Sequence, residues 1–242
     1  MSRRGLIFLT IAATLAAVCA GFAVYMQKQR AMTEPAQRLN AAEAAGELDE
    51  LRKRASTGDT EAQVKLARLN LEGNDRPANY AEAVRWLQPA AASNNAEAEF
   101  LLGTLYQTGR GVQRDYTNAL LWFEKAAAQK HAEALYNIGS LYGAGRGVMK
   151  DSQKAAQYYG QAAELGDSYA QFNMAQRCEL GTGVSTNFVE AWKWYHLAAL
   201  GGVADAPKRK AALESHMSAP ELQQAHQAVD AFLKQNGSPK SP

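Results

Sequence analysis

Histidine and cysteine side chains bind metals and act as nucleophiles, and the chain contains four histidines and two cysteines. The histidines are His131, His196, His216 and His226. They share no ligand spacing with one another or with a cysteine, so the sequence predicts no metal site. Cys178 occupies a position that tyrosine holds in two equivalent segments, which favours a small core residue over a nucleophile. Cys19 lies far away in an apolar run, so no disulfide framework can be built.

Three Gly-x-Gly pairs are the other candidates for chemistry, because glycine-rich loops can cradle phosphates. The pairs are Gly109 with Gly111, Gly145 with Gly147, and Gly181 with Gly183. They recur every 36 residues between two expected helices, which indicates turns and not nucleotide loops. The net charge of +2, from 26 Lys plus Arg and 24 Asp plus Glu, gives no field that would gather nucleic acid. We therefore expect no catalytic residue, no cofactor, no small-molecule substrate and no nucleic-acid partner.

An internal repeat organises most of the chain. Four blocks of 36 residues align without an insertion, and they span 60–95, 96–131, 132–167 and 168–203. Apolar residues recur at helical spacing in two segments of each block, which predicts a pair of helices per block. Abundant alanine and sparse proline and β-branched residues also favour helices over strands.

The first helix of each block carries small and apolar residues in fixed columns. The columns are Ala62, Ala98, Ala134 and Ala170; Leu66, Leu102, Ile138 and Met174; Ala67, Gly103, Gly139 and Ala175; and Leu69, Leu105 and Leu141. We expect Asp59, Asn95 and Asp167 to cap these helices at their start. Gly73, Gly109, Gly145 and Gly181 are expected to end them, because a left-handed residue is needed there.

The second helix of each block pairs large aromatics with small alanines. Its predicted N-caps are Asn79, Asp115, Asp151 and Asn187. Its predicted buried stripe is Ala83, Ala119, Ala155 and Ala191, followed by Trp86, Trp122, Tyr158 and Trp194. Such an alternation lets adjacent helix pairs interlock and bury the aromatic rings.

The repeated motif resembles that of a known family. The pattern A-x-x-x-L-G-x-L-Y-x-x-G-x-G-V-x-x-D-x-x-x-A-x-x-W-F-x-x-A-A, read from Ala98 to Ala127, is similar to the Sel-one-like repeat (SLR) family, a relative of the tetratricopeptide repeats. The first block departs from it, since Asp75 and Arg76 replace the second glycine and the valine. The resemblance implies an all-α fold, a right-handed α-solenoid of tetratricopeptide-like helix-turn-helix repeats.

The segments around the repeats have separate interpretations. Residues 28–58 are predicted to form a linker and an N-terminal capping helix, and residues 204–236 two C-terminal capping helices. A capping box at Ser218 and Glu221 opens the last helix. Residues 237–242 are predicted to be a disordered tail.

The N-terminus predicts a signal anchor over residues 1–27. Arg3 and Arg4 precede an apolar run from residue 5 to 26, about one bilayer in length, so residues 5–26 are predicted to be a transmembrane helix. Positively charged residues close to a membrane span tend to stay in the cytoplasm, so Arg3 and Arg4 predict a cytoplasmic N-terminus. The chain would then cross the inner membrane of a bacterium once, with the repeats in the periplasm. The alternative is signal cleavage near Ala20, which would leave a soluble periplasmic protein.

Two columns of the first helices supply the candidate partner-binding residues. The polar column is Arg68, Thr104, Ser140 and Gln176, and its varied chemistry is not required by the fold. With tetratricopeptide-like geometry, Glu97, Glu133 and Gln107 would face the same groove. The column of Phe100, Tyr136 and Phe172 either fills the core or lines the concave face, and an ordinary solvated face remains the alternative for the polar residues.

These features predict a non-enzymatic adaptor or scaffold of the bacterial cell envelope that offers a concave surface to a protein or peptide partner. One alternative is a periplasmic protein that binds or modifies peptidoglycan. Relatives linked to the cell wall look cysteine-rich with a disulfide in each repeat, and nothing of that kind exists in this sequence. The other alternative is a structural component of an envelope machine for secretion or motility.

Overall fold

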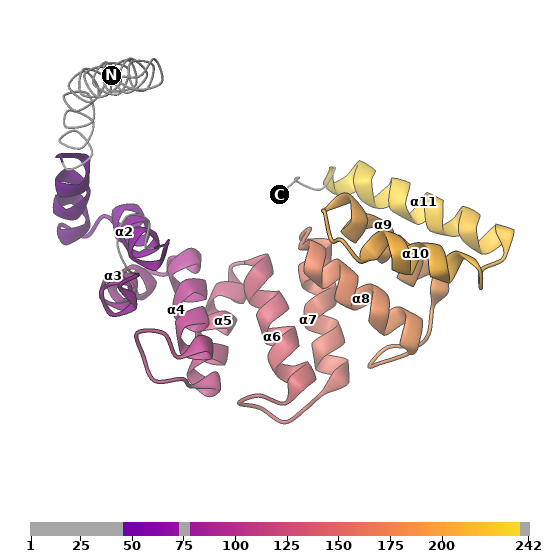
Figure 1. Cartoon of the computed structure of the whole chain (residues 1–242), viewed down its shortest axis with the longest axis horizontal. Coiled ribbons are helices and arrows are strands. Elements are labelled where there is room, and N and C mark those ends of the chain that lie inside the picture. Colours follow the sequence, from indigo (N-terminus) through magenta and orange to yellow (C-terminus); the bar gives the residue numbers. More distant parts are fainter. Residues whose placement is uncertain (1–45, 73–77, 238–242) are drawn as a thin grey trace, which may run out of the picture. The chain divides into compact units, whose positions relative to one another are not determined.

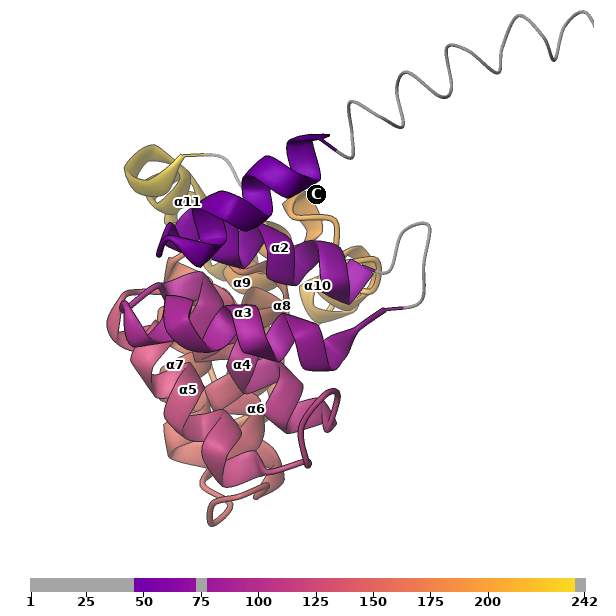
Figure 2. The same ribbon diagram turned by 90° about the vertical axis from the view of Figure 1, so that its left-hand side faces the viewer.

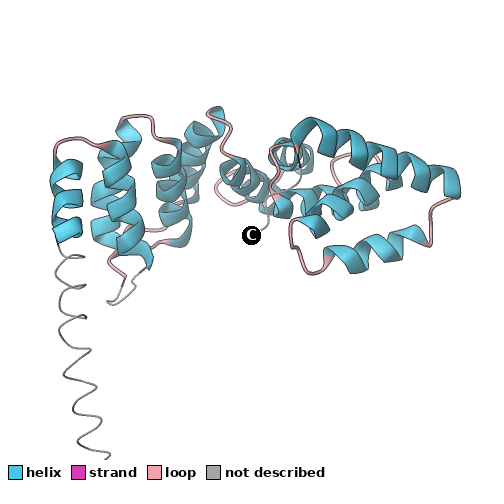
Figure 3. Ribbon diagram, turned by 90° about the horizontal axis from the view of Figure 1, so that it is seen from above, coloured by secondary structure: helices cyan, strands magenta, loops and turns pink. Residues whose placement is uncertain are grey.

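The computed structural model describes residues 46–72 and 78–237, and every regular element within these ranges is a helix (Figure 1 and Figure 3). The predicted anchor lies outside them, and the described part contains no helix that is both long and apolar enough to cross a bilayer. The chain divides into two units between Lys53 and Arg54. Residues 46–56 are helical, and all four repeats belong to the second unit.

Four pairs of 13-residue helices occupy the four predicted blocks. The first helices are α2 (Thr60–Glu72), α4 (Ala96–Thr108), α6 (Ala132–Ala144) and α8 (Ser168–Leu180). The second helices are α3 (Tyr80–Ala92), α5 (Tyr116–Ala128), α7 (Ser152–Glu164) and α9 (Phe188–Leu200). Two more helices follow, α10 (Ala206–Glu214) and α11 (Ala219–Asn236). The predicted all-helical repeat solenoid is confirmed.

The helices begin at the predicted caps. The side chains of Asn95 and Asp167 accept hydrogen bonds from backbone amides in the first turns of α4 and α8. Asp115 and Asp151 do the same at α5 and α7, where each carboxylate accepts two amides. These bonds satisfy amides that have no partner within the helix, so each helix start is fixed by sequence.

Left-handed glycines end three of the first helices. Gly109, Gly145 and Gly181 have φ of 72°, 66° and 69°, and each N–H donates to the carbonyl four residues earlier. The second glycine of each turn packs against the preceding repeat. A β-carbon at Gly147 would lie 2.7 Å from the carbonyl carbon of Tyr116, so a side chain at residue 147 would push the two repeats apart. Gly73 lies outside the described residues.

Apolar residues form three core clusters that follow one another along the second unit. The first runs from Val64 to Leu105, the second from Ala119 to Leu141, and the third from Leu135 to Val229. Figure 2, seen from the end that carries α2 and α3, shows these two helices side by side in front of the later ones. Each helix pair therefore buries its apolar faces against its neighbours in the chain.

The buried aromatic stripe of the second helices differs from the prediction by one residue. Trp86, Trp122 and Tyr158 are only half-buried, and of the predicted four only Trp194 is fully buried. The fully buried column is the next one along, Leu87, Phe123, Tyr159 and Tyr195. Adjacent positions on a helix are about 100° apart, so the seam between the two helices falls on the residue that follows each predicted aromatic, which is leucine in the first block and an aromatic in the other three. In the first helices, Leu69 is 38% exposed although Leu105 and Leu141 are buried as predicted.

The last two helices cover the end of the repeat array. Trp192 on α9 donates a hydrogen bond from Nε1 to Glu214 on α10 at 2.9 Å, and Trp194 meets the ring of Phe232 on α11 edge-on. The predicted capping box is present, because the Glu221 carboxylate accepts hydrogen bonds from the backbone and side chain of Ser218. These contacts remove the apolar face of α9 from water.

Candidate functional site

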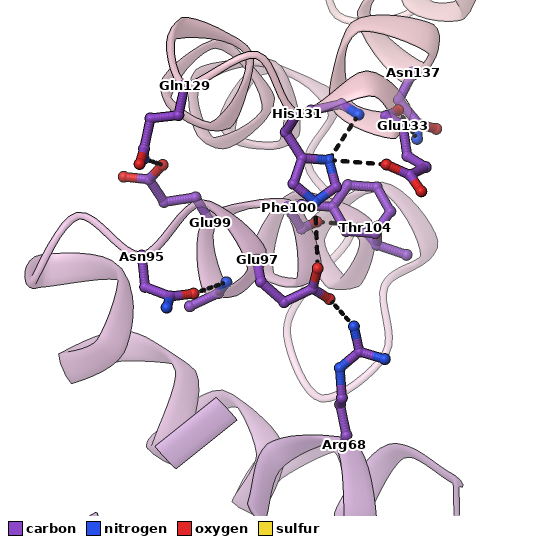
Figure 4. A network of polar contacts seen from close by, with 12 residues as sticks. Arg68, Asn95, Glu97, Glu99, Phe100, Thr104, Gln129, His131, Glu133 and Asn137 are labelled. Atoms are coloured by element: carbon purple, nitrogen blue, oxygen red, sulfur yellow. Dashed lines mark hydrogen bonds and ion pairs between the residues drawn. The ribbon is translucent and has the colours of Figure 1, made fainter. Parts of the chain in front are cut away.

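A chain of polar contacts crosses two repeat boundaries on the first helices (Figure 4). Arg68 on α2 pairs with Glu97 on α4 at 2.6 Å, and the other oxygen of Glu97 lies 3.2 Å from Nε2 of His131. Nδ1 of His131 lies 3.2 Å from the carboxylate of Glu133, at the start of α6. Three of the predicted site residues are thus brought together around a histidine that the sequence interpretation did not assign to the site.

His131 is placed by packing as well as by charge. Its imidazole lies nearly parallel to the ring of Phe100, with 4.6 Å between centroids. Nδ1 also accepts a hydrogen bond from the backbone amide of Ala134 at 3.4 Å, so the side chain of His131 is the N-cap of α6. One signal could have identified it: residue 131 falls in the cap column of Asp59, Asn95 and Asp167.

These contacts favour the ionised form of the Glu97 carboxylate. The hydrogen bond from His131, followed by the positive charge of Arg68, keeps the pKa of Glu97 below its usual value despite partial burial. Both carboxylate oxygens already have partners. Arg68 and Glu97 therefore join consecutive repeats, and their exposed edges remain as a fixed pair of charges on this face.

The aromatic column is shared between core and surface. The rings of Phe100, Tyr136 and Phe172 are half-buried, and each meets a buried ring of the following second helix at 5.5 to 6.0 Å. Tyr136 also lies 6.5 Å from the ring of Tyr169, which is 65% exposed. Each ring therefore stabilises its repeat with one side while its other side contributes to the first-helix face.

The remaining predicted residues vary in how firmly they are held. Thr104 donates its hydroxyl to the carbonyl of Phe100 at 3.1 Å, and Ser140 hydrogen-bonds the hydroxyl of Tyr159. Gln107 and Gln176 are half-buried, and neither side chain hydrogen-bonds within the described part of the chain. The structure thus brings Thr104 and Ser140 next to the aromatic column, and it leaves the side-chain amides of Gln107 and Gln176 without a hydrogen-bond partner among the described residues.

A buried polar column lies one position before the aromatic column, and sequence interpretation missed it. Gln63 and Gln171 each donate a side-chain hydrogen bond to the carbonyl of the residue eight positions earlier, Ala55 and Ala163, at 2.9 and 3.2 Å. Glu99 takes the same place in the second block, is fully buried, and accepts from Gln129 with one oxygen only. Burial raises the pKa of Glu99.

The thiol of Cys178 is buried in the last core cluster, which confirms its interpretation as a core residue. Burial raises its pKa to about 11, so the reactive thiolate is scarce at neutral pH. Among the described residues, no three His, Cys, Asp or Glu side chains are arranged to hold a metal ion.

Tandem helix pairs with small residues at their seams and a continuous first-helix face define a helical-repeat scaffold. The Sel1 repeat family model matches residues 60–95, 96–131, 132–167 and 168–203, so the chain belongs to the Sel1 repeat family. Proteins with these repeats generally mediate protein–protein interactions and are typically non-catalytic scaffolds. The comparison with curated proteins found no match.

Two solved structures are similar over 78% of this chain. One is c5321, a protective antigen of uropathogenic Escherichia coli strains with an SLR fold, at 31% identity and a TM-score of 0.72. This match covers 41% of that protein, so the chain spans about two fifths of its length. The other is a Sel1 repeat protein from Oxalobacter formigenes, at 31% identity and a TM-score of 0.65, with 78% of that protein covered.

Proposed function

We propose that this protein is a non-enzymatic adaptor whose first-helix face holds a protein or peptide partner. That face is made of the polar column Arg68, Thr104, Ser140 and Gln176, the aromatic column Phe100, Tyr136 and Phe172, and Glu97, Glu133 and Gln107. The observation that carries the proposal is the contact chain from Arg68 through Glu97 and His131 to Glu133. It makes one surface out of three repeats, which suits an extended partner.

The chemistry of the face supports a segment with both apolar and polar side chains. Half-exposed rings offer flat apolar area at low entropic cost, and the side-chain amides of Gln107 and Gln176 beside them offer hydrogen bonds. Glu133 is 62% exposed and is available to a cationic group of the partner. Variation of the polar column from one repeat to the next gives each repeat a different preference.

Site-specific photo-crosslinking in cells tests this proposal. A photoreactive residue at Ser140 or Gln176 should yield a discrete adduct with one partner, because both positions lie on the first-helix face. The matched positions are Gln153 and Gln161, which are exposed on the second helix α7. Equal adducts at all four positions, or adducts at Gln153 and Gln161 alone, would refute the first-helix face as the binding surface.

We propose further that residues 5–26 hold the protein in the inner membrane of a bacterium with the repeats in the periplasm. The length and hydrophobicity of this run and the two preceding arginines support the proposal. Alkaline extraction of membranes should leave the protein in the pellet, and a C-terminal alkaline phosphatase fusion should be active. A mature protein that begins after Ala20 and appears in the soluble fraction would instead demonstrate a cleaved signal.

A further inference from the structure

The turns between the two helices of the second and third repeats carry an exposed set of cations. We call Arg110, Arg114, Arg146 and Lys150 the basic turn edge. All four side chains are exposed, and none has a carboxylate within ion-pair distance among the described residues. Figure 1 shows the turns from α4 to α5 and from α6 to α7 along the lower margin of the helices. The turn from α8 to α9 lies along the same margin and contains no Lys or Arg.

Arginines from consecutive turns converge on one tyrosine. The guanidinium carbons of Arg114 and Arg146 each lie 5.8 Å from the ring centroid of Tyr116. The turn of residues 145–151 sits on the start of α5, because Gly147 packs directly against Tyr116. Arg110 lies 5.4 Å from the ring of Tyr80 in the same way one repeat earlier. The rings thus hold guanidinium groups of two repeats together without neutralising them.

The acidic side chains in these two turns do not cancel the basic ones. Asp115 and Asp151 are the N-caps of α5 and α7, and their carboxylates accept backbone amides. The pKa of Asp115 is lowered chiefly by its hydrogen bond with the amide of Asn118. Their charge is therefore directed at the helix ends, while the cations extend into solvent.

Large apolar side chains stand beside the cations. Met149, between the basic residues 146 and 150, is 90% exposed and is the most exposed large apolar side chain of the described part. Leu180, at the end of α8, is 71% exposed, and the turn that follows it packs on Ser152 at the start of α7. A hydrated polyanion would leave both side chains in water, whereas a bilayer surface accepts cations at its phosphates and apolar groups just below them.

We propose that the basic turn edge docks on the surface of a bilayer that contains anionic phospholipid, with Met149 entering the interfacial region. Guanidinium groups bind phosphate in a bidentate manner, and each basic residue near such a surface strengthens binding about fivefold. This docking is distinct from insertion of residues 5–26, and it involves a different surface from the first-helix face.

Fluorescence quenching by brominated lipid tests the proposal on the full-length chain. A Cys19→Ala, Met149→Cys protein carries an environment-sensitive label at residue 149, and Cys178 stays unlabelled because it is buried. The protein is reconstituted in phosphatidylcholine vesicles or in equal parts of phosphatidylcholine and phosphatidylglycerol. We expect quenching in the anionic vesicles only, and less of it at high ionic strength. A label at Ser93→Cys, in a turn at the opposite helix ends, should stay unquenched.

Charge variants separate the edge from the net charge of the protein. Arg114→Gln with Arg146→Gln should lower the docking equilibrium roughly 30-fold, since two cations are lost. Lys208→Gln with Arg209→Gln removes the same charge from exposed positions of α10 and should leave the quenching unchanged. Far-UV circular dichroism establishes whether both double variants are folded. If the Arg114→Gln, Arg146→Gln protein misfolds, it is replaced by Arg114→Lys with Arg146→Lys, which keeps both positive charges and should keep the quenching.

Three outcomes would overturn the proposal. The first is equal quenching in neutral and anionic vesicles. The second is a loss of quenching in the Lys208→Gln, Arg209→Gln protein as large as that in the Arg114→Gln, Arg146→Gln protein. The third is a label at residue 149 that stays unquenched in both kinds of vesicle. Binding of soluble polyglutamate or heparin at the edge with no quenching in vesicles would assign the edge to an acidic polymer and not to a membrane. Quenching of the label at residue 149 can also be measured on protein added to preformed vesicles. The test of the basic turn edge therefore does not depend on whether residues 5–26 span a membrane.

Discussion

Gly103 on α4 faces the ring of Phe123 on α5 so closely that a β-carbon at residue 103 would lie 2.6 Å from two ring carbons. Gly139 and Tyr159 repeat the relationship one block later, with 3.0 Å to the nearest ring carbon. Both rings are buried. In these two blocks the absence of a side chain on the first helix therefore leaves the space that the aromatic ring fills.

We predict that Gly103→Ala destabilises the protein although alanine favours helices. The added methyl overpacks the seam and should lower the free energy of unfolding by about 1 to 3 kcal/mol. Urea denaturation followed by far-UV circular dichroism measures the change.

Gly160 is the matched control, because it lies inside α7 with no atom near its potential β-carbon. Gly160→Ala should stabilise the protein by about 0.5 to 1 kcal/mol through helix propensity alone. If both substitutions stabilise, the close packing of Gly103 on Phe123 is wrong.

A second prediction concerns adjacent aromatics of α5. Phe123 is fully buried, so Phe123→Ala should cost about 3 to 5 kcal/mol. Trp122 is half-buried under Lys125, whose ammonium lies 4.1 Å from the ring centroid, and Trp122→Ala should cost about 1 to 2 kcal/mol. Denaturation midpoints at constant m-value give both numbers. A larger loss at Trp122 than at Phe123 would contradict the placement of the seam.

This pair of residues also shows what the sequence can and cannot predict about the fold. The period, the caps and the helix-ending glycines were predictable, because each rests on a local backbone requirement. The rotation of the second helix was not, since residues 122 and 123 are both aromatic and either could face the seam. Packing against Gly103 of the first helix selects Phe123. That contact joins two different helices, so the pattern within one helix does not reveal it.

The candidate site shows the same limit. Its columns were predictable from the repeat, because residues 36 apart share a face. The pairing of Arg68 with Glu97, and of Glu97 with His131, was not predictable, since it depends on side-chain reach across repeat boundaries. The buried position of Glu99 was also missed, because a carboxylate reads as a surface residue until its neighbours are known.

Glu99→Gln should stabilise the protein at neutral pH by about 1 kcal/mol. In the equivalent positions, Gln63 and Gln171 donate to a backbone carbonyl, while Glu99 leaves one oxygen without a partner among the described residues. An amide restores that hydrogen bond and removes the cost of burying a charge.

The pH dependence of this effect has a definite sign. The pKa of Glu99 is raised by burial, so its favourable protonated form is fully present below the ordinary value of 4.5 and is lost as the pH rises through the folded-state pKa. The stability advantage of Glu99→Gln should therefore grow between pH 4.5 and neutrality. An advantage that is constant over this range would show that Glu99 reaches solvent.

His131 can be tested with two substitutions that separate its cap from its other contacts. His131→Asn keeps a capping side chain, as Asn95 shows for α4, but loses the stacking on Phe100 and the bond to Glu97. We expect it to cost about 1 kcal/mol, and His131→Ala to cost about 1 kcal/mol more because the cap of α6 is also lost. Urea denaturation at neutral pH gives both values.

Acid should reduce the difference between wild type and either His131 variant. The pKa of Glu97 is lowered chiefly by its hydrogen bond with His131, so this contribution to stability is present above 4.5 and is lost as the pH falls through the folded-state pKa. Both variants lack that bond and should lose less stability over the same acid range. If the difference stays constant on acidification, the Glu97–His131 contact contributes no stability, and the polar chain across the repeats is held by Arg68 and Glu97 alone.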